Sequence, residues 1–321
     1  MSRPKIHLTA PSNWINDPNG FIYYNGEYHL FYQYFPYECK WGTMHWGHAT
    51  SIDLVNWKHH KIALYPTKEY DQNGCFSGTA IIKDEELHLY YTAIKYDKFR
   101  EGNIHSPYDN ESFEASQAKM VSRDGYTFDN YEDKKMIIPA IRDKELGHRT
   151  HTRDPKVWKY KDGYSMILGS KFKIEGNEKF TGEALFYTSK NGEEWTYKNR
   201  CYDDTIGDMW ECPDLFYVDG KTVFMFSPQG LKAEGDKYKN IFQSGYLIGD
   251  KINFYDGKFN HGDFNELDRG FDFYAPQSLV DDKGRRIVIG WANSWPWMKC
   301  FTDFGPNMED KWNGAMSLPR E

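Results

Sequence analysis

The chain has 321 residues, of which 17% are aromatic and 27% charged, and its formal net charge is −7 at pH 7. This length suffices for one large all-β unit or for two ordinary domains. The small net charge excludes the strongly basic surface of a nucleic-acid or polybasic membrane binder, and no apolar run approaches the roughly 18–20 residues of a membrane helix.

The N-terminal segment, residues 1–12, carries Arg3 and Lys5 but no apolar stretch after them. We therefore expect no secretory signal, and the cytoplasm is the default location. The cysteines form an odd set without Cys-x-x-Cys spacing, which disfavours both a disulfide framework and a zinc site. We expect five free thiols, at Cys39, Cys75, Cys201, Cys212 and Cys300.

A strand–turn–strand unit recurs five times along the chain. Most of its turns carry Asn-Gly or Asp-Gly, which suit tight hairpins because type I′ turns need a positive φ at both central residues. In chain order the predicted turns are Asn25-Gly26, Asp84-Glu85, Asp162-Gly163, Asp219-Gly220 and Asp282-Lys283-Gly284. Five units of about 64 residues account for the whole chain.

In the first three units a third strand follows and ends in a Ser-x-[Asp/Asn] corner, at Ser51, Ser122 and Ser189. The fourth copy is degenerate and the fifth is missing. Units of three or four antiparallel strands, repeated five times, predict an all-β fold in which residues 1–321 form one five-bladed β-propeller. A strand near Ile6–Leu8 is expected to help close the ring.

Three of the five units carry an acid at nearly the same position, just before or at the start of the first strand: Asp17, Asp154 and Glu211. The first strand of each propeller blade lines the central channel, so we expect these acids to face one another. Any one of them, beside Pro or Gly, could be an ordinary turn residue. Because gathered carboxylates repel, three in register favour a shared use, either metal binding or acid/base chemistry.

Several motifs in the chain, in their order, resemble glycoside hydrolase family 32. They are Trp14-Ile15-Asn16-Asp17-Pro18-Asn19-Gly20, Phe76-Ser77-Gly78, Arg153-Asp154-Pro155, Trp210-Glu211-Cys212-Pro213 and the segment Gly314 to Glu321. The family comprises invertases, sucrose-6-phosphate hydrolases, inulinases and levanases, and its catalytic domain is a five-bladed propeller. Typical members continue into a C-terminal β-sandwich, which is expected to be absent from this chain.

The resemblance implies that Asp17 is the nucleophile, Glu211 the general acid/base and Asp154 the transition-state stabiliser. For this chemistry Asp17 should stay ionised, Glu211 should have a high pKa, and the two carboxyls should lie roughly 5–5.5 Å apart. Arg153 is expected to keep Asp17 and Asp154 charged, or else to form an ordinary ion pair. Cys212 either donates a weak hydrogen bond near Glu211 or is a small buried residue.

The resemblance also implies a set of substrate-binding residues: Asn16, Gln33, Trp41, Phe76, Ser77, Arg153, Tyr274 and Trp291. Aromatic rings suit the apolar faces of sugars, and amides and hydroxyls pair with their hydroxyl groups. No Gly-rich phosphate loop occurs, so no cofactor is expected. The pairs His45/His48 and His148/His151 have a spacing of three, but on strands and loops this does not place both rings together, and we expect no metal.

The resemblance, taken with these observations, implies a retaining β-fructofuranosidase that hydrolyses sucrose or sucrose 6-phosphate through a covalent fructosyl-enzyme. Its partner would be a small sugar, with neither nucleic acid nor membrane, and the oligomeric state is open. His45, Arg100 and Lys171 are candidates for a phosphate subsite. A fructan hydrolase or a fructosyltransferase is the alternative; a fructan-binding propeller without catalysis and a related arabinan-type hydrolase are disfavoured.

Overall fold

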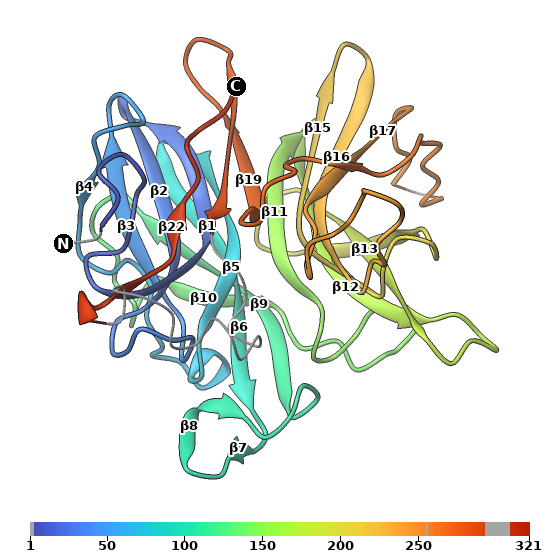
Figure 1. Ribbon diagram of the computed structural model, residues 1–321, viewed down its shortest axis with the longest axis horizontal. Coiled ribbons are helices and arrows are strands. Elements are labelled where there is room, and N and C mark those ends of the chain that lie inside the picture. Colours follow the sequence, from blue (N-terminus) through green and yellow to red (C-terminus); the bar gives the residue numbers. More distant parts are fainter. Residues whose placement is uncertain (1–2, 255, 293–308) are drawn as a thin grey trace.

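Five β-sheets are arranged around a central axis in the computed structural model, which describes residues 3–254, 256–292 and 309–321 (Figure 1). The first strands of the sheets contact one another in a closed cycle, in the order β1, β5, β11, β15, β19 and back to β1. This is the predicted five-bladed propeller, which is thereby confirmed. Among the described residues, no helix has the length and apolar character needed to cross a membrane.

The blades consist of the following strands. Blade 1 holds β1 (Asn13–Tyr24), β2 (Glu27–Phe35), β3 (His45–Ser51), β4 (Lys58–His59) and β21 (Trp312–Asn313). Blade 2 holds β5 (Cys75–Lys83), β6 (Glu86–Tyr96), β9 (Phe113–Ser122) and β10 (Lys134–Ile138). Blade 3 holds β11 (Arg153–Tyr160), β12 (Gly163–Lys173), β13 (Phe180–Ser189) and β14 (Thr196–Tyr202).

Blade 4 holds β15 (Met209–Val218), β16 (Lys221–Gln229), β17 (Gly245–Gly249) and β18 (Asn265–Glu266). Blade 5 holds β19 (Tyr274–Val280), β20 (Arg286–Ala292) and β22 (Ala315–Met316). A separate hairpin of β7 (Phe99–Arg100) and β8 (Asn103–Pro107) projects from blade 2 between β6 and β9 (Figure 1). A 3₁₀ turn, η1, spans Glu69–Asp71.

The predicted hairpins join the first two strands of every blade. In blade 1, Tyr24 pairs with Glu27 across the turn, and Asn25 and Gly26 have φ values of 50° and 85°, as the type I′ geometry requires. In blade 3 the turn lies one residue earlier than predicted, because Gly163 already pairs with Tyr160.

The Ser-x-[Asp/Asn] corners share one hydrogen-bonding scheme. In blade 1 the Ser51 hydroxyl accepts from the backbone N–H of Leu54 at 2.8 Å, and Asp53 Oδ1 accepts from the N–H groups of Val55 and Asn56. Ser122 with Asp124, and Ser189 with Asn191, repeat it. The short polar side chains thus satisfy backbone donors where the third strand ends.

Ring closure differs from the expectation. No strand forms at Ile6–Leu8. Instead, the segment near the C-terminal end pairs with two blades, since β21 runs parallel to β1 and β22 runs antiparallel to β20. The N-terminal segment takes part through one backbone bond, from the N–H of Met316 to the carbonyl of Leu8.

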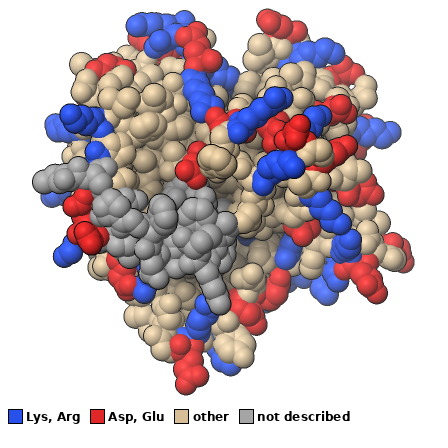
Figure 2. All heavy atoms as spheres, in the orientation of Figure 1, with Lys and Arg blue, Asp and Glu red and all other residues tan. Residues whose placement is uncertain are grey.

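The core lies between neighbouring blades and is rich in aromatic side chains, as the composition predicted. Trp14, Trp46, Trp210 and Trp291 are almost completely buried. On the face drawn in Figure 2, acidic and basic side chains are interspersed rather than gathered by sign. The described cysteines Cys39, Cys75, Cys201 and Cys212 are free thiols, and Cys300 lies outside the described residues.

Candidate active site

Every blade carries a register irregularity near the beginning of its first strand. Such bulges bend a strand and redirect its side chains. In each of them one residue stands directly before a proline or, in blade 2, before Gly78. These five residues, which we call the axial residues, are Asp17, Ser77, Asp154, Cys212 and Ala275. In blades 3 to 5 the axial residue has a positive φ, of 64°, 49° and 51° respectively.

Four of the axial residues contact one another across blades. The Ser77 hydroxyl donates to Asp17 Oδ2 at 2.5 Å, and the Cys212 thiol lies 3.6 Å from both Asp17 Oδ2 and Asp154 Oδ2. The backbone N–H of Cys212 also donates to Asp154 Oδ2, at 2.9 Å. Asp17 and Asp154, 137 positions apart in the chain, therefore share one sulfur neighbour.

Glu211 does not occupy an axial position, because it stands one residue earlier, where the other blades have Asn16, Phe76, Arg153 and Tyr274. Both oxygens of its carboxyl accept hydrogen bonds. Arg153 donates to Oε1 from Nε at 3.0 Å and from its Nη2 at 2.6 Å. Gln229 donates to Oε2 at 2.6 Å, and the Tyr274 hydroxyl donates to the same oxygen.

Of the two expectations for Arg153, the ion pair is found, and the guanidinium also lowers the pKa of Asp154, as expected. Arg153 pairs with Glu211 and not with Asp17, because the guanidinium and Glu211 extend from matching positions of adjacent blades. The Cys212 thiol contacts the carboxyls of Asp17 and Asp154 rather than that of its neighbour Glu211. The bulge accounts for this, since it turns consecutive side chains to different neighbours.

The pKa directions in the ligand-free protein are also opposite to those expected. Burial raises the pKa of Asp17, against the lowering effect of the Ser77 hydrogen bond. Burial, partly offset by Arg153, raises the pKa of Asp154 to about 7. Burial alone would raise the pKa of Glu211, but Arg153 and the Tyr274 hydroxyl outweigh it and lower the pKa. Burial and the nearby aspartates keep the Cys212 thiol protonated by raising its pKa.

A cavity of about 660 Å³ opens onto the three acids. The predicted residues Asn16, Gln33, Trp41, Phe76, Ser77 and Arg153 line it together with Asp17, Asp154 and Glu211. Trp41 and Phe76 pack edge to face, with ring centroids 5.8 Å apart, and so present aromatic surface beside polar groups.

Two of the predicted substrate-binding residues do not line this cavity. Tyr274 is buried behind Glu211, to which its hydroxyl donates. Trp291 has no exposed surface and packs edge to face on Trp14, 5.7 Å between centroids. Trp14 in turn donates to Asn16 Oδ1 at 2.7 Å. These large rings support the cavity wall from behind, because the inner ends of β1, β19 and β20 pack directly against one another.

The cavity also includes residues that the motifs did not indicate. Blade 2 and its β7–β8 hairpin contribute Tyr96, Arg100, Ser106, Pro107 and Phe113, and the loop after β16 contributes Ile241 and Phe242. Gln229, Asn110 and His151 complete the wall. Loop residues of this kind carry no periodic signal in the sequence.

Of the three candidates for a phosphate subsite, only Arg100 lies at the cavity. His45 is buried, and its Nδ1 donates to the carbonyl of Thr43 at 2.9 Å. Lys171 pairs with Glu111 at 3.2 Å and lines a different cavity. The described residues contain no cluster of three or more His, Cys, Asp or Glu that could hold a metal ion.

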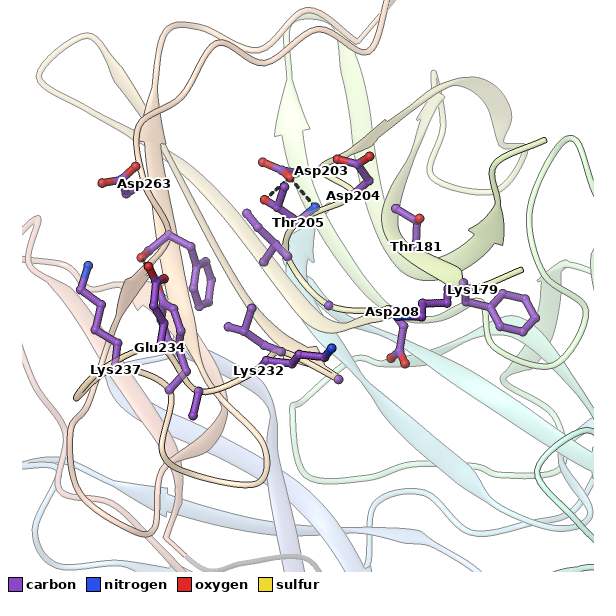
Figure 3. Close-up of a pocket in the computed structure, with 18 of the residues that line it drawn as sticks. Lys179, Thr181, Asp203, Asp204, Thr205, Asp208, Lys232, Glu234, Lys237 and Asp263 are labelled. Atoms are coloured by element: carbon purple, nitrogen blue, oxygen red, sulfur yellow. Dashed lines mark hydrogen bonds between the residues drawn. The ribbon is translucent and has the colours of Figure 1, made fainter. Parts of the chain in front are cut away.

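A larger cavity, of about 1170 Å³, lies between blades 3 and 4 and holds none of the three acids (Figure 3). Its acidic side chains are dispersed, and Asp203 is engaged within its own loop by the backbone and hydroxyl of Thr205. Convergence of buried carboxyls, rather than volume, therefore identifies the site at the propeller axis.

Comparison with known proteins agrees with this fold. The family described as "Glycosyl hydrolases family 32 N-terminal domain" matches residues 7–321. Sucrose-6-phosphate hydrolase of Bacillus subtilis is 39% identical over 99% of this chain and 62% of its own length. Raffinose invertase of Escherichia coli is 37% identical over 99% of this chain and 62% of its own length.

Solved structures give the same result. A GH32 beta-fructofuranosidase of Bombyx mori superposes with a TM-score of 0.83 and 38% identity, covering 99% of this chain and 62% of that one. A mutant of that enzyme has been solved in complex with sucrose. The chain thus spans about three-fifths of the length of the relatives that it matches.

Proposed function

Because the chain belongs to glycosyl hydrolases family 32, we propose that it carries the catalytic machinery of a retaining β-fructofuranosidase acting on sucrose or sucrose 6-phosphate. One observation carries the proposal. Three buried carboxyls, Asp17, Asp154 and Glu211, come from three blades to one cavity, where Cys212 joins the first two and Arg153 holds the third.

In the proposed first step an oxygen of Asp17 attacks the anomeric carbon of the fructosyl unit, while Glu211 gives its proton to the departing glycosidic oxygen. The bond to the leaving sugar breaks, and fructose is held as an ester on Asp17. In the second step water attacks the same carbon, Glu211 takes a proton from that water, and Asp17 leaves as a carboxylate. Asp154 is placed to accept hydrogen bonds from fructose hydroxyls.

For this mechanism the order in which the three carboxyls hold protons changes when sugar binds. Hydroxyls that donate to Asp154 and Asp17 favour their ionised forms, and the proton passes to Glu211. The basic limb of the pH profile of kcat reports the complex, so it should lie above the pKa of Glu211 titrated in the free protein. Coincidence of the two values would contradict this inference.

Support for a phosphorylated substrate comes from Arg100. It lies at the cavity on the β7–β8 hairpin, and among the described residues no ion pair neutralises its guanidinium. A phosphate on the leaving sugar would supply the missing anion. The relatives named above include both a sucrose-6-phosphate hydrolase and an invertase of raffinose.

The proposal is tested by measuring hexose release from sucrose, sucrose 6-phosphate and inulin at equal concentration, with the Asp17→Asn variant as blank. We expect release from sucrose or its phosphate, with β-fructofuranose as the first anomer seen by NMR. An inverted first anomer, or equal release by the blank, would overturn the retaining mechanism.

A further inference from the structure

His151 connects the site to a loop outside it. The residue lines the cavity two positions before Arg153, and its Nδ1 lies 3.0 Å from the Nη1 of Arg153. A guanidinium only donates, so Nδ1 must accept and the ring proton must be on Nε2. Nε2 lies 2.8 Å from the carbonyl of Asn110 and 3.2 Å from Glu111 Oε1, and both of these oxygens accept. The neutral ring therefore satisfies both of its nitrogens.

Arg153 is consequently held along two edges. Its Nε and Nη2 face Glu211 Oε1, and its Nη1 faces His151. The guanidinium is planar and rigid, so fixing Nη1 also fixes the direction of the other two donors. Arg153 and Glu211 are both largely buried, where the orientation of a charged group matters more than it does in water.

We propose that His151 is a positioning residue, which fixes the Arg153 guanidinium against Glu211 and thereby governs how readily this carboxyl keeps its proton. The inference rests on the proposed function for its catalytic consequence, because Glu211 is the group that must release and recover a proton. It assigns a use to one of the two histidine pairs that the sequence singled out and that metal binding does not explain.

The charged groups around His151 agree with a neutral ring. Besides Arg153 on β11, these are Glu111 in the loop before β9, Lys171 on β12 and His148, whose ring centroid is 5.1 Å away. Burial lowers the pKa of His151, against Glu111, which raises it. A second ring proton, on Nδ1, would point at the Nη1 donor of Arg153. The neutral ring avoids this repulsion between two donors.

Two amide variants separate positioning from packing. In His151→Asn the amide oxygen can reach the place of Nδ1 and still accept from Arg153. In His151→Gln the longer side chain carries the amide to the place of Nε2, so the Arg153 donor loses its acceptor. His88→Gln is the control, since His88 is also buried but lies on β6 and does not line the cavity.

The first readout needs no activity. The pKa of Glu211 is titrated by ¹³C NMR of labelled glutamate, with Glu211→Gln used to assign its signal. We expect the pKa to rise by about 1 unit in His151→Gln, because Arg153 stabilises the carboxylate less well, and to stay at the wild-type value in His151→Asn and His88→Gln. The proposal is overturned if His151→Gln leaves the pKa unchanged, or if His151→Asn shifts it as far.

The second readout connects this change to catalysis. In His151→Gln the basic limb of kcat/KM for sucrose should move to higher pH, whereas hydrolysis of β-fructofuranosyl fluoride, whose leaving group needs no proton, should change little. A wild-type protein that hydrolyses neither substrate would contradict the proposed function, and the NMR titration would still decide the role of His151.

Discussion

The two ends of the first strands obey different rules. At the hairpin ends all five blades join their first two strands by a short turn, of two residues in blades 1 to 4 and of five residues, between Val280 and Arg286, in blade 5. At the bulged ends every first strand has a register irregularity, but the axial residues are an aspartate, a serine, a second aspartate, a cysteine and an alanine. In this propeller, therefore, residues at the hairpin ends of the first strands determine the fold, whereas residues at the bulged ends form the candidate active site.

The strongest test of this difference between the two strand ends removes the reactive carboxyl from one bulge. Asp17→Asn keeps the size of the axial side chain but cannot form the fructosyl ester, so kcat should fall by about 10⁴-fold or more. The melting temperature should change little, since burial of the uncharged amide replaces burial of a carboxyl whose pKa is already raised. Hexose release measures kcat, and thermal unfolding measures the melting temperature. A variant that retains a tenth of the wild-type kcat would refute the assignment of Asp17 as the nucleophile.

Blade 2 offers a test of the bulge backbone itself. A Cβ on Gly78 would lie 1.9 Å from the carbonyl oxygen of Tyr90 in β6. Gly78→Ala should therefore cost about 2–4 kcal/mol of unfolding free energy, because strand β5 must move away from its partner. Urea unfolding measures the loss, and an unchanged midpoint would show that the bulge tolerates a side chain.

Ser77 tests whether an axial residue without a carboxyl contributes to chemistry. Ser77→Ala removes the 2.5 Å hydrogen bond to Asp17, and we expect kcat to fall about 10- to 100-fold. The hydrogen bond from Ser77 lowers the pKa of Asp17, so this pKa should rise in the variant. The acidic limb of the pH profile of kcat should therefore move to higher pH. Ser122→Ala, at a corner outside the cavity, is the matched control and should leave kcat unchanged.

Arg100 tests the outer wall of the same cavity. Arg100→Met should raise KM for sucrose 6-phosphate about fivefold more than KM for sucrose, as an exposed charge pair is worth about 1 kcal/mol. Lys98→Met removes a cation that stacks on Tyr108 and does not line the cavity, and it should affect both substrates alike. Equal effects of Arg100→Met on the two substrates would remove Arg100 from the phosphate subsite.

The smallest effect is expected at a hairpin end. Gly26 has a φ of 85°, and a Cβ there would meet nothing within 4 Å. Gly26→Ala should cost about 1 kcal/mol, from backbone conformation alone, with kcat unchanged. Chemical unfolding and a sucrose assay check this, and a fall in kcat would mean that the two strand ends are not independent.

The fold was accessible to sequence analysis because its signals are local. Asn25-Gly26 and Ser51 with Asp53 specify their turns through their own backbone geometry and hydrogen bonds, and repetition supplies the blade count. Ring closure was missed because it depends on Trp312–Asn313 and Ala315–Met316, short pairings between distant segments that carry no local pattern.

The acids of the site were predicted, and an ion pair of Arg153 was one of two expectations, but which carboxyl meets which partner was not predicted. Asp17, Asp154 and Glu211 stand in recognisable motifs, but a bulge decides which neighbour each side chain meets. Arg153 therefore pairs with Glu211, and Tyr274 lies behind Glu211 rather than in the cavity. The protonation order likewise depends on burial and on these pairs, which no spacing in the sequence records.

The most direct measurement of the central claim is mass spectrometry of protein quenched in acid during turnover of sucrose or sucrose 6-phosphate. We predict one added fructosyl unit on the peptide that contains Asp17, and none in the Asp17→Asn variant. A fructosyl group on any other residue, or steady turnover with a first product of inverted configuration, would contradict the claim that the blade 1 bulge presents the nucleophile.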